Sequence, residues 1–106
     1  MTLSELLAYV DEHSGHRLLD GSPEETVQKA RLGTHADPLA GEIVSLLAAA
    51  VGSDGLSRAG ATTALGALRL RYMRDDAPVA GFRMVEHVVH AIDGAFNEEA
   101  LRARSR

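Results

Sequence analysis

Histidine is the side chain in this sequence best suited to chemistry, because it titrates near neutral pH and binds metal ions. The chain contains five histidines and no cysteine. Four of the histidines form two pairs with i, i+3 spacing: His13 with His16, and His87 with His90. In a helix this spacing places both imidazoles on one face, where a carboxylate can complete a divalent-metal site.

The second pair belongs to a polar face of the last long predicted helix. This candidate polar site consists of Arg83, Glu86, His87, His90 and Asp93. Glu86, His90 and Asp93 have the spacing needed to meet at one ion if a neighbouring helix adds a ligand. The same face also fits a solvated helix surface with ordinary i, i+4 pairs. Because neither HExxH nor a repeated ExxH is present, we expect no resident metal or cofactor and no catalytic residues, with a helical metal-binding protein or hydrolase as the alternative.

Other catalytic chemistries find no support in the sequence. The lack of cysteine excludes disulfides, thiolate zinc sites, iron–sulfur clusters and cysteine nucleophiles. No serine stands in a GxSxG motif, and the glycines form neither a P-loop nor a dinucleotide-binding fingerprint. We therefore expect a protein that is not an enzyme.

The charge balance opposes binding to nucleic acids and to anionic membranes. Fifteen acidic and eleven basic side chains give a formal net charge of -4. A helix-turn-helix can still be drawn around the turn at 52–55, with Arg58, Thr62 and Arg69 presented to DNA. A compact DNA-binding regulator is thus a second alternative, although Ala59-Gly60-Ala61 supplies no polar base-reading side chains.

No part of the sequence predicts export or membrane insertion. The first residues lack the basic region, apolar stretch and cleavage site of a secretory signal. The longest strongly apolar run, 43–51, is far shorter than the roughly 20 residues that span a bilayer. The expected location is cytoplasmic.

The elements that must position these residues are helices. Apolar residues recur at helical spacing, and runs typical of strands are missing, so we predict an all-α, compact bundle of about five helices in a single domain, 1–106. Capping residues and prolines place the helix starts near residues 3, 23, 38, 58 and 79. The fifth helix is expected to end near residue 97, followed by a frayed basic tail.

The fifth predicted helix carries a heptad-like apolar seam. Its residues, spaced by three and four, are Phe82, Val85, Val89, Ile92 and Phe96. A chain this short has limited capacity to bury such a seam together with the broad apolar face of the third helix. The seam is therefore either intramolecular core or a dimer interface. We expect a small protein-interaction or regulatory accessory module that forms a homodimer or binds another protein.

Overall fold

The computed structural model describes residues 1–105, and over this range its regular elements are all α-helices, with no β-strand. The helices are α1 (Leu3–His13), α2 (Pro23–Leu32), α3 (Pro38–Ala49), α4 (Arg58–Tyr72) and α5 (Val79–Arg104). None of these five is both long and apolar enough to cross a membrane. The prediction of an all-α bundle of about five helices is confirmed.

Local sequence signals explain where the helices begin. The N-cap side chains of the first four helices accept hydrogen bonds from first-turn amides and are Thr2, Ser22, Asp37 and Ser57. Glu5 and Glu25 complete capping boxes in α1 and α2 by accepting a bond from the N-cap amide. These bonds satisfy amides that a helix start leaves without an intrahelical partner. All five predicted starts are therefore confirmed.

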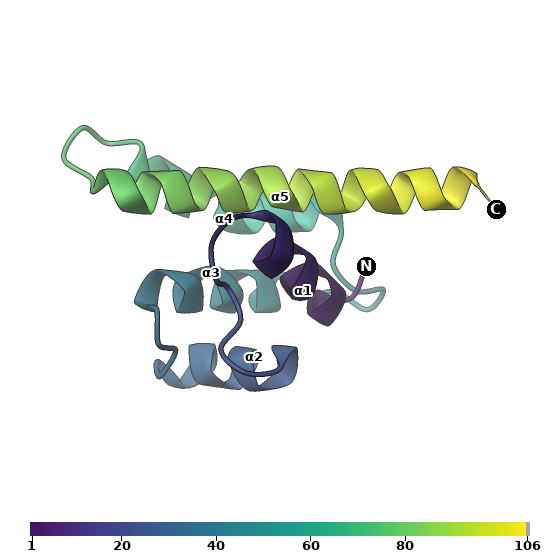
Figure 1. The fold of residues 1–106 in the computed structure, drawn as a ribbon, viewed down its shortest axis with the longest axis horizontal. Coiled ribbons are helices and arrows are strands. Elements are labelled where there is room, and N and C mark those ends of the chain that lie inside the picture. Colours follow the sequence, from purple (N-terminus) through teal and green to yellow (C-terminus); the bar gives the residue numbers. More distant parts are fainter. Residues whose placement is uncertain (106) are drawn as a thin grey trace.

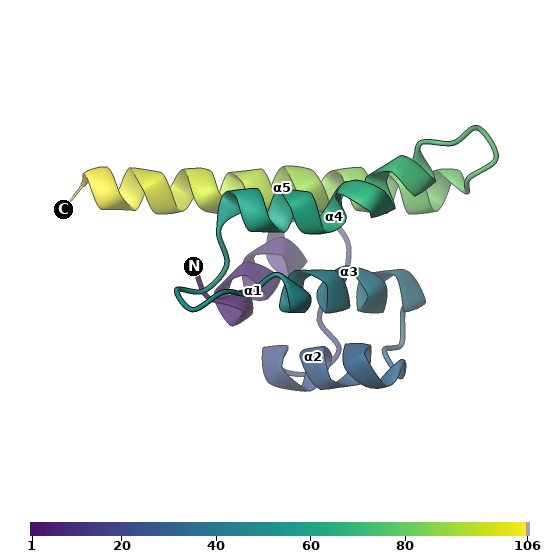
Figure 2. The same cartoon turned by 180° about the vertical axis from the view of Figure 1, so that it is seen from behind.

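The helices lie in three layers (Figure 1). α4 and α5 form an antiparallel hairpin in one layer, α1 and α3 lie beneath it, and α2 forms the outermost layer against α3. The view from behind shows the same order, with α4 in front of α5 (Figure 2). The 26 residues of α5 correspond to about 39 Å of helix, so this helix sets the long dimension of the molecule.

The core lies between the first two layers and is built from aliphatic side chains. Its largest fully buried members include Leu6, Leu7, Leu18, Ile43, Leu47, Leu65, Leu68 and Ile92. By contrast, the only fully buried residue of α2 is Thr26. Its hydroxyl donates to the Ser22 carbonyl at 2.8 Å and accepts from the Asp20 amide at 2.7 Å. In the sequence, the apolar face of this helix is thin, consisting mainly of Val27, Ala30 and Leu32, which predicts a peripheral helix. The structure confirms this prediction (Figure 1).

The buried face of α5 differs from the predicted seam. The residues that α5 buries are Met84, Val85, Val88, Ala91, Ile92, Ala95 and Phe96. Of the seam residues, Val85, Ile92 and Phe96 are buried within the chain, whereas Val89 is only half-buried and Phe82 is 38% exposed. The reason is that α5 packs against both α4 and α1, so it buries a wide arc on which positions 82 and 89, seven residues apart, occupy one edge.

The end of α5 also differs from the expectation. The helix continues through Asn97, where a cap and a frayed tail were predicted, and reaches Arg104. The segment 98–104 contains only good helix formers, and Glu98 pairs with Arg102 one turn on. These last turns extend past the rest of the bundle with exposed side chains (Figures 1 and 2). Arg106, the last residue of the predicted tail, lies outside the described residues.

Candidate functional site

The two carboxylates of the predicted polar site are held in ion pairs with α4. Arg69 donates from Nε and Nη2 to the two carboxylate oxygens of Glu86, at 2.8 and 2.9 Å. Arg58 Nε lies 3.5 Å from Asp93 Oδ1, and its Nη2 donates to the Asp93 carbonyl at 2.9 Å. The hydrogen bonds from Arg69 hold the pKa of Glu86 below its ordinary 4.5, against the opposing effect of partial burial. Glu86 and Asp93 therefore join the hairpin helices together.

His87 points to a different element. Its Nδ1 lies 2.9 Å from Nε2 of His16, so one imidazole donates a hydrogen bond to the other. His16 belongs to the turn that follows α1 and is 71 positions away in the sequence. The tertiary structure thus joins one histidine from each predicted pair, while the two i, i+3 pairs themselves do not act as units.

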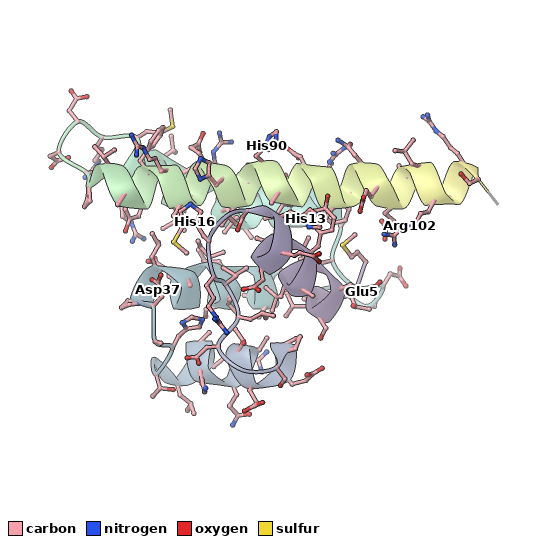
Figure 3. All side chains as sticks on the ribbon, viewed as in Figure 1. Glu5, His13, His16, Asp37, His90 and Arg102 are labelled. Atoms are coloured by element: carbon pink, nitrogen blue, oxygen red, sulfur yellow. The ribbon has the colours of Figure 1, made fainter. Side chains whose placement is uncertain are left out.

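His90, another member of the candidate site, faces away from this contact. Figure 3 shows His90 on one side of α5 and His16 and His13 on the other, and Arg83 is exposed. His13 stacks on Tyr9, with ring centroids 3.9 Å apart, and its Nδ1 lies 2.9 Å from the Tyr9 carbonyl oxygen. Among residues 1–105, no three histidine, aspartate or glutamate side chains are arranged to hold a metal ion. Glu86, His90 and Asp93 therefore do not meet at one point.

The basic residues considered for DNA reading are likewise engaged within the chain. Arg58 also donates to Asn97 Oδ1 at 2.6 Å, in addition to its contacts with Asp93. Arg69 is occupied by Glu86, whereas Thr62 is exposed on α4. A DNA-binding role would require both arginines to leave these carboxylates.

His35, for which the sequence predicted no role, lies between two shallow hollows of about 310 and 330 Å³. Its Nδ1 accepts from the Asp37 amide at 2.9 Å, so the proton is on Nε2, which donates to the Leu18 carbonyl at 2.9 Å. Both nitrogens are therefore used to hold the Leu18 segment to the start of α3. The position of His35 two residues before a helix cap was the available signal for this structural role.

The α4–α5 hairpin carries an apolar surface that was not predicted from the sequence. Four of the seven large exposed apolar residues lie at the end of α4 and in the first turn of α5. We call these four the hairpin patch: Leu70, Met73, Val79 and Phe82. The ring of Tyr72 packs on Gly81, which holds the two helix ends together. The available signal was helical spacing, which places Leu70 and Met73 outside the apolar stripe formed by Ala61, Ala64, Leu65, Leu68 and Tyr72.

The hairpin patch lies at the end of the molecule opposite both chain termini (Figure 1). Exposed charged residues of both signs adjoin it in the sequence, namely Arg74, Asp75, Asp76 and Arg83. Family models, curated proteins and solved structures were all compared with the chain, and no match was found.

Proposed function

We propose that the chain is a small protein-interaction module that assembles as a homodimer through the hairpin patch. The observation that carries the proposal is the gathering of four of the seven large exposed apolar side chains at one helix hairpin. Single exposed apolar residues are ordinary on soluble proteins, whereas groups of them in one region of the fold mark interaction surfaces. The patch belongs to α4 and α5, which pack against each other more extensively than any other helix pair, so its backbone is held in place.

The charges around the patch favour a second copy of the chain as the partner. In a two-fold symmetric dimer each surface meets itself. We call the charged residues that adjoin the patch in the sequence its rim: Arg74, Asp75, Asp76 and Arg83. Because the rim carries both signs of charge, a two-fold axis allows arginines of one copy to face aspartates of the other. A partner surface of a single charge sign would instead meet like charges on part of this rim.

The other arginines near the end of α4 do not disturb this arrangement. Arg69 is paired with Glu86, and Arg71 donates from Nη1 and Nη2 to the carboxylate of Glu42 at 3.2 and 2.9 Å. Their positive charges are therefore balanced within each copy. The Arg69–Glu86 pair also counts against the two alternatives. A metal-dependent hydrolase would need the Glu86 carboxylate to be free, and a DNA-binding regulator would need Arg69 to be free.

Sedimentation of Met73→Asp against a matched control tests the proposal. The wild-type protein is expected to be a dimer at micromolar concentration, and Met73→Asp a folded monomer, because the new carboxylate would be buried without a partner in the interface. Leu32→Asp places the same charge on an exposed apolar residue outside the patch, on α2, and should leave the dimer intact.

Both variants are expected to remain folded, because both substituted side chains are exposed, and circular dichroism checks this. A wild-type protein that stays monomeric up to about 100 μM would overturn the proposal. Equal dissociation of the Leu32→Asp and Met73→Asp variants would also contradict it, because the effect would then be independent of the patch.

A further inference from the structure

We propose that His16 and His87 form a two-imidazole site for a divalent transition-metal ion such as Zn²⁺ or Cu²⁺. His16 Nε2 and His87 Nδ1 face each other at 2.9 Å. Neutral imidazole nitrogens are the protein ligands that these ions take most readily when thiolates are absent. The site differs from the predicted polar face, because its ligands come from two elements that only the fold brings together.

The distance between the two nitrogens is close to that of a metal-bound pair. A tetrahedral zinc ion with bonds of about 2.0–2.1 Å separates two ligand nitrogens by about 3.3 Å. The two rings are inclined by 37°, with centroids 5.1 Å apart. An opening of about half an ångström, achieved by side-chain rotation, replaces the shared hydrogen bond with a bound ion.

Both histidines are held by rigid backbone. The hydroxyl of Ser14 accepts from the His16 amide at 3.1 Å and donates to the His16 carbonyl at 3.0 Å. Between these residues, Gly15 adopts φ +77°, a conformation that glycine reaches without strain. His87 lies within α5, next to the fully buried Val88. Binding therefore requires little ordering of the backbone.

The site is open as well as incomplete. His87 is exposed, and His16 lines the wall of the 330 Å³ hollow. Since residues 1–105 place no third ligand beside the pair, water or a donor atom from another molecule takes the remaining positions. The affinity for zinc is therefore expected to be weaker than that of a closed structural site with four protein ligands.

Metal binding at this pair would couple the turn after α1 to α5. The two ligands are 71 residues apart, so the unfolded chain does not hold them together. A ligand that binds only the folded state raises the melting temperature.

The experiment is a calorimetric titration of untagged, chelator-treated protein with ZnCl₂ near neutral pH. The wild-type protein is expected to bind one zinc ion per chain. His16→Gln and His87→Gln should each raise the dissociation constant at least about tenfold. The matched controls His13→Gln and His90→Gln each remove another exposed histidine and should bind zinc as the wild type does.

Electron paramagnetic resonance of the Cu²⁺-loaded wild-type protein gives a reading independent of the variants, with coupling to two imidazole nitrogens expected. A spectrum with a single imidazole nitrogen would overturn the proposal. So would zinc affinity that is unchanged in His16→Gln and His87→Gln, reduced equally in all four variants, or absent in the wild type. Comparable circular dichroism of the five proteins shows that folding is not the cause of the differences.

Discussion

Asp20 connects three parts of the chain through a single carboxylate. Its Oδ2 accepts from the amide of Ala36, just before α3, at 2.9 Å, and its Oδ1 accepts from Lys29 Nζ of α2 at 3.0 Å. The bond from the Ala36 amide, followed by the bond from Lys29, lowers the pKa of Asp20 below its ordinary 3.8. Folding thus favours the charged form of this side chain.

Acid should therefore weaken the protein in part through Asp20. A carboxylate whose pKa is lower in the folded state adds stability above its unfolded value, and this contribution is lost as the pH falls through the folded value. We expect Asp20→Asn to be less stable than the wild type near neutral pH. The difference should shrink as the pH falls below 3.8.

Urea denaturation of both proteins at a series of pH values measures this effect. A constant difference between the two proteins from neutral to acidic pH would contradict the role assigned to the Asp20 carboxylate. The exposed Asp54, on the turn between α3 and α4, is a suitable control position for the same change to asparagine.

Two glycines of the α4–α5 hairpin differ in whether helix packing leaves room for a larger residue. A Cβ added to Gly66, inside α4, would meet nothing within 4 Å. A Cβ added to Gly81, in the first turn of α5, would clash with Cε1 of Tyr72. Helix propensity favours alanine at both positions, but packing allows it only at Gly66.

The two alanine variants should therefore have opposite effects. Gly66→Ala is expected to stabilise the protein by about 0.5–1 kcal/mol, because alanine loses less backbone entropy than glycine on helix formation. Gly81→Ala is expected to destabilise it by at least about 1 kcal/mol, since the Tyr72 ring must move. Thermal and chemical denaturation measure both values. A gain in stability at Gly81 would show that the Tyr72 contact does not constrain the hairpin.

The layered order of the whole molecule predicts an order of local opening. α2 lies in the outermost layer and contributes Thr26 as its only fully buried residue, whereas the middle of α5 packs on both α1 and α4. Helices with few buried apolar contacts open at lower free energy than the core. Native-state hydrogen exchange should find the amides of α2 exchanging before those around Val88. Equal free energies of exchange in the two helices would contradict this layered stability.

The helix starts could be predicted because their causes are local. A serine or aspartate cap followed by a proline at the first helical position acts within one turn, as at Ser22 and Asp37. At Ser22, Glu25 adds a capping box. The end of α5 was harder to predict, because Asn97 offered a local cap. Its side chain instead accepts a hydrogen bond from Arg58 of α4, a contact between residues 39 positions apart.

The sequence by itself determined the all-helical class, the five helix starts and the peripheral place of α2, since these depend on spacing and on neighbours in the chain. Only the tertiary structure decided which polar groups meet. Glu86 and Asp93 turn to arginines of α4, and His87 turns to His16. The physical reason is that one helix face is visible in the sequence, whereas the partner of each position depends on how separate helices stack.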